Sequence, residues 1–500
     1  MLRRLPAALV LVLALALAGA ASEPGLLVTP GEVTATTAGV WVRSDNRGEI
    51  SIEARQTGGD GAVTGLLRIT RRNDSTGKLL LAGLKPATRY AWQVRAAGQT
   101  VKGEFVTAPA HDQAARVAFL WSGDLGGAGL CRRVDGGYRI FKTMARQRPD
   151  FFLFVGDTVY ADRKCDGPGV VPGADFVART LGQYRDRHRY QREDQPMQEF
   201  LRLASVYAIW DDHEVTNDFS GPSEPLMPTG RRAFLEYWPI LPPDEEPTRL
   251  YRKFRWGKLL EVFILDTRQY RSPNTDLDGP GKTMLGAAQR RWLVDNVSAS
   301  NAVWKVVVSS VSLSIPTGRP ERRDSWSNAG PFGLPLEGGT GFAVERDAIL
   351  RQLRERGVKN LVFLVADVHH AELIRHRPTP SFAFHEFVAG PLSASLGRPR
   401  PLDEGLNPRS LFARGGRQQL RRGHDRARAP QRPADRRGGR GPLHPHDRAG
   451  LAQTIHALSR VKEQVSRTPE RPCPNAFTQG PFQIRVLELL PRPQVSAHLV

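Results

Sequence analysis

Seven short apolar runs follow one another from residue 116 onward, and each ends in a polar turn. Runs of Val, Ile, Leu and Phe are typical of strands buried on both faces. Helix-length segments such as DGGYRIFKTMARQRPD, residues 135–150, lie between them. This alternation predicts an α/β fold. The runs are RVAFLWSGD (116–124), FFLFVGDTVYAD (151–162), VYAIWDDHE (206–214), LLEVFILDTRQYRS (259–272), WKVVVSSVSL (304–313), NLVFLVADVHHAEL (360–373) and SFAFHEFVAGP (381–391).

Acidic residues stand at the carboxyl ends of most of these strands. A single Asp at a strand end is more often a turn former or a helix cap than a ligand. Repetition in α/β order is harder to explain by caps, because converging carboxylates repel one another and raise each other's pKa unless a cation is present. The strand ends carry Asp124, Asp157, Asp211, Asp212, His213, Glu214, Asp266, Asp367, His369 and His370.

The ligand types indicate the chemistry. Carboxylate oxygens suit Ca²⁺, Mg²⁺, Mn²⁺ or ferric iron, and imidazole suits transition metals. Two metal ions ~3.5–4 Å apart commonly hydrolyse phosphate esters, since they activate water and stabilise the attacking and leaving oxygens. The strand ends therefore predict a metal-dependent phosphoesterase.

The same series of motifs resembles the calcineurin-like metallophosphoesterases, and within them the alkaline phosphatase D family of secreted enzymes. The resemblance implies a four-layer α/β/β/α catalytic domain over residues 116–415. It also implies hydrolysis of phosphate mono- or diesters by a metal-bound hydroxide. The supporting segments are SGD (122–124), GDTVYAD (156–162), WDDHEVTND (210–218), LDTRQYRS (265–272), LGAAQRRWL (285–293) and ADVHHAE (366–372).

Individual roles follow from this resemblance. Asp124 is expected to bind the first metal ion, Asp157 to bridge both ions, and Asp367 and His369 to divide between them. Most metallophosphoesterases carry Gly-Asn-His-Glu at the third strand end. The resemblance therefore assigns Asp212 to the second metal ion. It assigns His213 to catalysis, by stabilising the phosphoryl oxygens or protonating the leaving alkoxide.

Three further residues are candidates. Tyr160 is expected to bind ferric iron as a tyrosinate, and Cys131 matches an iron ligand of some family members. A Cys131–Cys165 disulfide or a buried thiol are the alternatives for that cysteine. Arg268 could bind the substrate phosphate bidentately, although pairing with a structural Asp such as Asp266 is as common. A Cys, Tyr and Asp set favours iron and the carboxylate-rich side favours calcium, with Zn, Mn or Mg as alternatives.

The N-terminus predicts export. Arg3 and Arg4 precede an apolar run at residues 5–18 and a small-residue cleavage site at residues 18–20. This order is typical of a signal peptide, which we place at residues 1–21. We expect a periplasmic or extracellular protein. An uncleaved anchor is the alternative, and the route, Sec or twin-arginine, is open.

Residues 26–108 predict a small β-module. Segments such as GVWVRS and EISIEAR alternate apolar and polar residues, as half-buried strands do. LAGLKPATRYAWQVRA, residues 81–96, resembles the tyrosine corner of fibronectin type III-like sandwiches, in which Tyr90 would bond to the chain upstream. Residues 106–115 are then a linker to the catalytic domain.

The net charge of +20 gives little support for nucleic-acid binding. Between Arg414 and Arg448 there are 11 Arg against 3 Asp, which concentrates the positive charge in one short stretch. We expect a monomer without specific nucleic-acid recognition, acting on a small phosphate ester or a phosphodiester polymer. The alternatives are a phosphodiesterase or phospholipase D-type enzyme, and an inactive cell-wall-binding protein.

The basic stretch at residues 417–449 lacks any strand or helix period. One reading is a disordered tail that binds polyanions. The other is a shifted reading frame, because family members close this domain with strands that often begin Asn-Phe-Gly. Codons permitted for residues 418–425, read one base later, can give Ser-Asn-Phe-Gly-Val-Val-Thr-Ile. Residues after about Gly416, Cys473 included, would then be unfolded or poorly packed and leave a sheet edge exposed.

Resequencing the coding DNA around Gly415, Gly416 and Arg417 tests this reading. We expect a missing or extra base, and better solubility for the protein expressed in the restored frame. If the DNA confirms the present frame and the tail resists proteolysis as one packed unit, the reading-frame hypothesis is wrong.

Overall fold

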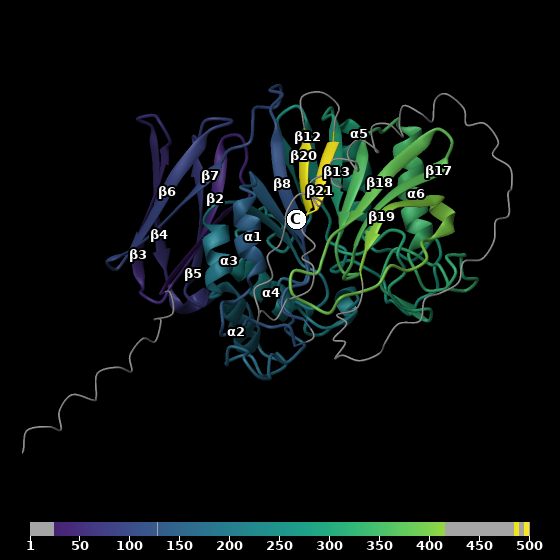
Figure 1. Cartoon of the computed structure of the whole chain (residues 1–500), viewed down its shortest axis with the longest axis horizontal. Coiled ribbons are helices and arrows are strands. Elements are labelled where there is room, and N and C mark those ends of the chain that lie inside the picture. The colour runs from purple at the N-terminus through teal and green to yellow at the C-terminus, as the bar shows by residue number, and fades with distance from the viewer. Residues whose placement is uncertain (1–24, 128, 416–484, 490–494, 500) are drawn as a thin grey trace, which may run out of the picture.

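The computed structural model describes residues 25–127 and 129–415, with the backbone of 485–489 and 495–499 (Figure 1). The expected signal peptide, the basic stretch at 417–449 and Cys473 lie outside the described residues. All seven predicted strands are present, and the mixed α/β fold with several sheets is confirmed.

Two sheets lie face to face in the part of the chain after residue 116. In the first, β8, β9 and β10 run parallel, and in the second β12, β13, β16 and β18 do. The first sheet contains β8 (Val117–Ser122), β9 (Phe151–Val155) and β10 (Ser205–Ile209); the second contains, in spatial order, β11 (Arg252–Trp256), β12 (Leu260–Ile264), β13 (Trp304–Val308), β16 (Leu361–Val365), β18 (Phe382–Val388), β17 (Ala371–Thr379) and β19 (Pro408–Arg414).

Helices cover the outer faces of both sheets (Figure 1). Phe141, Phe200 and Phe234 of the helices beside the first sheet share one core with its strands, whereas Leu293 and Ile349 belong to the core of the second. The order of layers is helices, sheet, sheet, helices. The helices are α1 (Ile140–Arg146), α2 (Leu181–Arg192), α3 (Gln195–Leu201) and α4 (Met227–Tyr237) beside the first sheet, and α5 (Gly286–Ala299) and α6 (Ala343–Glu355) beside the second.

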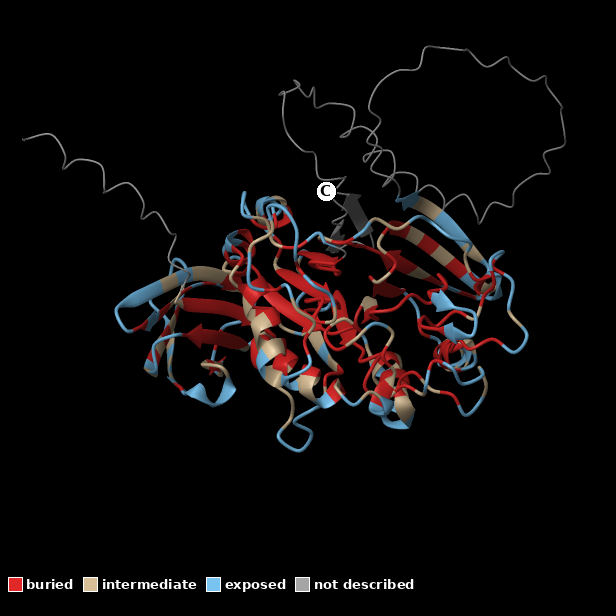
Figure 2. Cartoon of the chain, turned by 90° about the horizontal axis from the view of Figure 1, so that it is seen from below, coloured by how far each residue is buried: buried red, intermediate tan, exposed pale blue. Residues whose placement is uncertain are grey.

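Aromatic side chains fill the space between the two sheets. The ring centroids of Phe151 and Trp256 lie 4.5 Å apart, as do those of Tyr207 and Phe254. The Trp256 indole Nε1 donates a hydrogen bond to the Tyr207 hydroxyl at 3.0 Å, so the polar atoms of this buried pair are satisfied. Figure 2 shows buried residues concentrated in the strands and exposed residues at the loops.

The strands before residue 108 form two layers, of which one is an extension of the first sheet. β1, β2 and β5 make a three-stranded part, and β4, β3, β6 and β7 make a separate four-stranded sheet. The Tyr90 hydroxyl accepts a hydrogen bond from the Lys85 backbone N–H at 2.9 Å, which confirms the predicted tyrosine-corner contact. The bounds are β1 (Leu26–Gly31), β2 (Thr37–Ser44), β3 (Gly48–Gln56), β4 (Ala62–Ile69), β5 (Thr76–Ala82), β6 (Arg89–Ala96) and β7 (Gln99–Val106).

The N-terminal strands are continuous with the first sheet. β1 pairs in parallel with β10 at Gly31 and Val206, so the three-stranded part extends the sheet that carries β8 and β9. A Cβ atom at Gly31 would lie 2.4 Å from both the Val206 carbonyl and the Pro239 ring. Glycine is therefore required where the two parts of the sheet meet.

A buried arginine holds this junction together. The Arg192 guanidinium lies 4.1 Å from the ring centroid of Trp41 in β2 and 4.6 Å from that of Trp238. It donates hydrogen bonds to Thr29 Oγ1 and to the Tyr237 carbonyl. Arg192 is 1% exposed, and burial lowers its pKa to about 9. The two indole faces and the two oxygens offset the cost of burying its positive charge.

Two strands close to the C-terminus join the other end of the first sheet. β20 (Arg485–Leu489) pairs antiparallel with β8, and β21 (Val495–Leu499) pairs with β20. At these ten backbone positions the chain forms strands and covers one edge of the sheet, whereas the expectation that the segment after about Gly416 is unfolded or poorly packed stays a prediction. The ten positions supply alternating hydrogen-bond partners to an edge that would otherwise be open.

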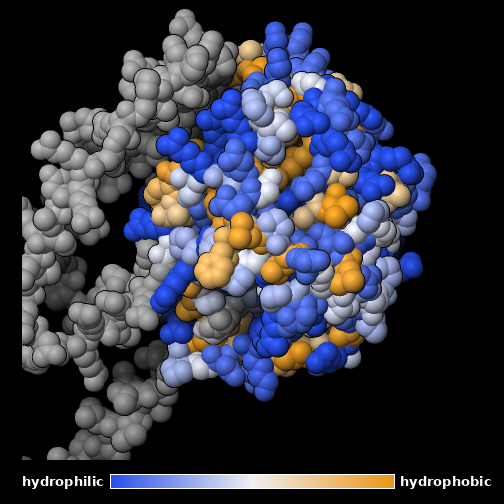
Figure 3. All heavy atoms as spheres, turned by 90° about the vertical axis from the view of Figure 1, so that its right-hand side faces the viewer, coloured by the Kyte–Doolittle hydropathy of each residue, from blue (hydrophilic) through white to orange (hydrophobic). Residues whose placement is uncertain are grey.

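Among the described residues, no helix has the length and apolar character needed to cross a bilayer. The face beside α6 and β17, seen in Figure 3, is mostly hydrophilic, and its hydrophobic residues form small separate groups.

Replacing the buried guanidinium should loosen the junction. We expect Arg192→Ala to lower the free energy of unfolding by about 3 kcal/mol, because it leaves a cavity and two unsatisfied oxygens. Urea unfolding measures this loss. Arg68→Ala, on the exposed side of β4, is the control and should change stability by less than ~0.5 kcal/mol. Equal stability of the two variants would contradict the role of Arg192.

Candidate metal centre

The predicted ligands come together where the parallel strands of both sheets end. Asp124 follows β8, Asp157 follows β9 and Asp212 follows β10, while Asp367 and His369 follow β16. Four of these five residues have positive φ: Asp124 at 64°, Asp157 at 50°, Asp367 at 66° and His369 at 57°. Such conformations cost free energy and gather at functional sites, where the fold holds the turn in place.

Two groups of ligand atoms share one residue. Asp124, Asp157 and His369 form the first group, and Asp157, Asp212 and His213 form the second. Within each group the candidate ligand atoms all lie within 4.8 Å of one another. Asp157 belongs to both groups, and its role as a bridge between two metal ions stays a prediction.

The electrostatics of the buried carboxylates fit a cation. Burial first, and then neighbouring carboxylates such as Asp211, hold the pKa values of Asp124, Asp157 and Asp367 well above their usual range. The Oδ2 atoms of Asp124 and Asp367 are buried and have no hydrogen-bond partner. Oxygens left in this state are costly, and multivalent cations would relieve both the repulsion and the missing contacts.

Asp367 lies beside the first group of ligand atoms but belongs to neither group. Its backbone N–H donates to Asp124 Oδ1 at 3.2 Å, which ties the turn after β16 to the turn after β8. The ring of His369 is oriented by a hydrogen bond on its Nδ1 side, where Nδ1–H donates to the Ser395 carbonyl at 2.7 Å. Nε2 therefore carries the lone pair, and it lies 3.1 Å from the Tyr160 hydroxyl.

The turn after β10 is held by its own acidic residues. Asp212 Oδ2 accepts the Asp218 N–H at 2.7 Å, and Glu214 accepts the Asp211 N–H at 2.9 Å together with the N–H and hydroxyl of Thr158. Burial alone would raise the pKa of Asp212, but His213 and Arg268 outweigh it and keep that pKa below its usual range. Asp212 is thus kept ionised, and the hydrogen bond from Asp218 fixes its carboxylate.

His213 is fixed by a residue that the sequence reasoning did not assign. Its Nδ1 donates to Asp162 Oδ1 at 2.7 Å, and its ring stacks on Tyr160 with centroids 4.1 Å apart. Burial alone would lower the pKa of His213, but Asp212 and Asp162 outweigh it and raise the pKa to about 9. The available signal was the position of Asp162, five residues after Asp157 in the same strand-end loop.

Arg268 does not lie where a substrate could reach it, which corrects its assignment to substrate binding. Its side chain is 0% exposed; Nε donates to Asp211 Oδ1 at 2.6 Å and both Nη atoms donate to Asp324 at 2.7 Å. Arg271 donates to the same Asp324 carboxylate at 2.8 Å. The partner Asp266, expected from the sequence, instead accepts the Arg268 backbone N–H.

A third acidic group is already neutralised by these two arginines. Asp212, Asp218 and Asp324 have carboxylate oxygens within 4.8 Å of one another. Because Arg268 and Arg271 pair with Asp324, this group serves to join the turn after β10 to the loop at residues 316–327. Asp324 lies in no strand-end motif, so the sequence offered no signal for it.

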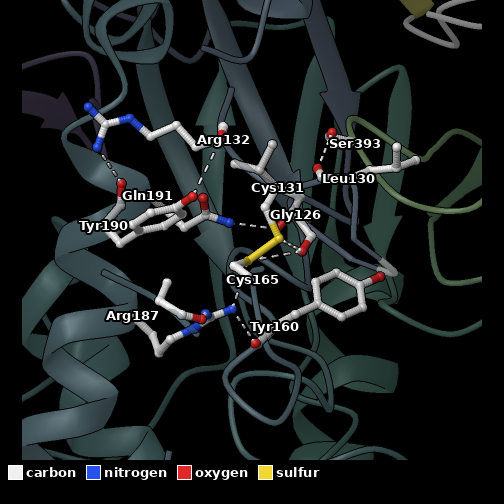
Figure 4. Close-up of a disulfide and its surroundings, with 12 residues drawn as sticks. Gly126, Leu130, Cys131, Arg132, Tyr160, Cys165, Arg187, Tyr190, Gln191 and Ser393 are labelled. Atoms are coloured by element: carbon white, nitrogen blue, oxygen red, sulfur yellow. Dashed lines mark hydrogen bonds between the residues drawn. A yellow bond between two sulfur atoms is a disulfide. The ribbon is translucent and has the colours of Figure 1, made fainter. Parts of the chain in front are cut away.

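Cys131 is a disulfide partner and not a metal ligand, which corrects its place in the predicted ligand set. Cys131 and Cys165 are joined with Cα atoms 5.7 Å apart (Figure 4). The Cys131 sulfur therefore takes part in a covalent bond and is not available as a thiolate ligand. Arg187 Nη2 donates both to Cys165 Sγ and to the Tyr160 carbonyl, at 3.3 and 2.7 Å, so this arginine links the disulfide to the Tyr160 backbone.

The Tyr160 ring lies at the centre of the site. It is 3% exposed, stacks on His213 and hydrogen-bonds His369. A Cβ atom at Gly127 would lie 2.6 Å from the ring, so only glycine allows this close approach. Burial, and then Asp157 and Asp124, hold the pKa of Tyr160 well above its usual range, which only a nearby cation would reverse.

Comparison with known proteins agrees with this geometry. A model of the PhoD-like phosphatase family matches residues 125–422. Alkaline phosphatase D of Bacillus subtilis (strain 168) is 26% identical over 269 residues, which cover 48% of this chain and 44% of that protein. The chain therefore matches less than half the length of this relative.

Solved structures share the fold. The structure of PhoD aligns with a TM-score of 0.61 at 21% identity, covering 73% of this chain and 77% of that one. The purple acid phosphatase PPD1 from yellow lupin (Lupinus luteus) seeds aligns with a TM-score of 0.54 at 15% identity, covering 78% and 68%. Since the family model matches more than half of the sequence, the chain belongs to the PhoD-like phosphatase family.

Proposed function

We propose that the protein is a metal-dependent phosphoesterase that hydrolyses phosphate mono- or diesters. The observation that carries the proposal is Asp157, whose carboxylate belongs to two ligand groups at once. Asp124 and His369 would hold one metal ion, and Asp212 would hold the other beside the shared Asp157. Two ions at such a site supply activated water and neutralise charge on the phosphate.

His213 is the proposed proton donor. With Nδ1–H directed at Asp162, its Nε2 faces away from that carboxylate and is available to the substrate. The cationic ring can donate the Nε2 proton to the leaving oxygen or to a phosphoryl oxygen. Asp162 orients the ring and stabilises its positive charge, in the manner of a carboxylate behind a catalytic histidine.

The two ions need not be alike. Tyr160 and His369 on one side provide ligands that suit iron, whereas the carboxylates around Asp212 suit a harder ion such as calcium. The disulfide at Cys131 removes the thiolate from the argument for iron and leaves Tyr160 as its main support.

Export and domain organisation form part of the same proposal. The Cys131–Cys165 disulfide suits an oxidising compartment, which supports a periplasmic or extracellular protein with a signal peptide at residues 1–21. We assign residues 26–108 to a fibronectin type III-like module and 116–415 to the catalytic domain. The described ligand positions argue against an inactive cell-wall-binding protein, and a preference for diesters is the enzymatic alternative.

Removing the shared carboxylate should remove the metal centre. We expect Asp157→Ala to lose bound metal, measured by elemental analysis, and to hydrolyse neither p-nitrophenyl phosphate nor bis-p-nitrophenyl phosphate. The exposed Asp112→Ala is the control. Wild-type metal content and activity in Asp157→Ala would contradict the two-ion proposal. Activity of the wild type on only one of the two esters would decide between a monoesterase and a diesterase.

His213→Ala should separate catalysis from metal binding. We expect near-normal metal content and a turnover lower by ~10²–10⁴, the range for a general acid or transition-state donor. Asp162→Asn should cause a smaller loss, because the ring keeps a partner but not the stabilising charge. His111→Ala, on the exposed linker, is the control. Full turnover in His213→Ala would show that the histidine is structural.

A further inference from the structure

Three exposed arginines surround the metal centre, and each comes from a different loop. Arg163 lies directly after Asp162 in the loop following β9, and its side chain is 55% exposed. Its Nη2 donates to Asn217 Oδ1 at 3.3 Å, which places the guanidinium beside the turn that follows β10. It is therefore on the rim of the site next to His213.

Arg322 approaches the same turn from another direction. It belongs to the short hairpin of β14 (Gly318–Arg319) and β15 (Arg322–Arg323). Its Nη2 donates to the Asp218 carbonyl at 3.3 Å, and the Asp218 N–H in turn donates to the ligand Asp212. The hairpin thus brings an exposed cation within two hydrogen bonds of a metal ligand.

Arg400 stands on the His369 side. The segment before it holds His369 from behind, through the Ser395 carbonyl and through the Gly397 N–H, which donates to the His369 carbonyl at 2.7 Å. Arg400 Nη1 donates to the Pro316 carbonyl at 3.0 Å, and Pro316 belongs to the loop that follows β13. The exposed guanidinium is therefore held by the loop after β13, three residues beyond the Gly397 that contacts His369.

These arginines differ from the two buried ones. The buried Arg268 and Arg271 form ion pairs with Asp211 and Asp324. The three arginines on the rim are exposed and donate hydrogen bonds mainly to neutral oxygens.

We propose that Arg163, Arg322 and Arg400 form a recognition rim for a second anionic group, so that the enzyme prefers phosphoesters carrying another phosphate near the scissile one. This inference rests on the proposed phosphoesterase function. The buried metal centre would bind the scissile phosphate. Outside it, Arg322 and Arg400 donate to backbone carbonyls, and Arg163 approaches the carboxylate of Asp162 only at 3.9 Å, so the three guanidinium groups can still bind an anion. Arginine forks bind phosphate bidentately, and their field extends over about 8–10 Å at physiological salt.

A matched pair of substrates tests the rim. Thymidine 5′-(p-nitrophenyl phosphate) and its 3′-phosphorylated form share the scissile bond and the leaving group, and differ only by the second phosphate. We expect the wild type to show a kcat/KM several-fold higher for the 3′-phosphorylated form. The triple variant Arg163→Gln, Arg322→Gln, Arg400→Gln should lose about tenfold on that substrate and less than about twofold on the other. Should diesters not be cleaved, ribose 5-phosphate and the same ester with a second phosphate replace the pair.

Control variants separate local recognition from net charge. A triple exchange of Arg55, Arg89 and Arg356 to Gln also removes three exposed positive charges. Arg55 lies in β3, Arg89 in β6 and Arg356 at the end of α6, so none of them belongs to the site loops. This exchange should leave the preference unchanged. Because Arg163 lies 3.9 Å from Asp162, the single variants Arg322→Gln and Arg400→Gln check that the loss does not come from a disturbed His213.

The outcomes distinguish the two proposals. No hydrolysis of any phosphate ester by the metal-loaded wild type would overturn the proposed function and the rim together. Hydrolysis with equal kcat/KM for the paired substrates, or a preference that survives the triple exchange at the rim, would overturn the rim alone. Equal losses in the rim variant and the control variant would show a general charge effect and likewise overturn it.

Discussion

The mutual repulsion of carboxylates at the ends of parallel strands is the constraint on which the site depends. Asp124, Asp157 and Asp367 are buried among other acidic residues, and burial raises the pKa values of all three carboxyl groups. The fold relieves part of this repulsion itself. Arg268 forms ion pairs with Asp211 and Asp324, whereas Asp124 and Asp367 each keep a buried carboxylate oxygen without a hydrogen-bond partner. The remaining group of buried carboxylates and histidines is one that a cation would stabilise.

The rest of the molecule keeps these turns in register. The disulfide and Arg187 fix the backbone at Tyr160, and Ser395 fixes the ring of His369, so the two residues that touch each other are set from opposite sheets. The N-terminal strands contribute through the sheet itself. Since β1 pairs with β10 and Arg192 is held between two tryptophans, the β-module supports the strand that ends in Asp211 and Asp212. It acts as part of the catalytic scaffold more than as an appended domain.

Two assignments failed for the same reason. Cys131 and Arg268 have side chains whose role depends on the partner they find, and the partners lie 34 and 56 residues away in the chain. Nothing local distinguishes a cysteine that meets another cysteine from one that meets a metal ion. Likewise, an arginine in a strand-end loop can face solvent or the interior, and the position of Asp324 decided which. Asp162 was overlooked because a carboxylate next to an arginine in a loop is an ordinary surface pattern.

The sequence by itself determined the strands, their order and the residues at their ends. Apolar runs such as FFLFV favour strands buried on both faces, and the Asp that ends most of these runs must then stand at an edge of the sheet. The sequence also determined the tyrosine corner, whose contact spans only five residues. Tertiary structure alone decided which strand ends meet, that Asp157 is shared by two ligand groups, and that the sheet continues into the N-terminal module. The physical reason is range: local pattern fixes which face a residue buries, whereas pairing between distant carboxylates, arginines and cysteines is fixed only when the sheets pack.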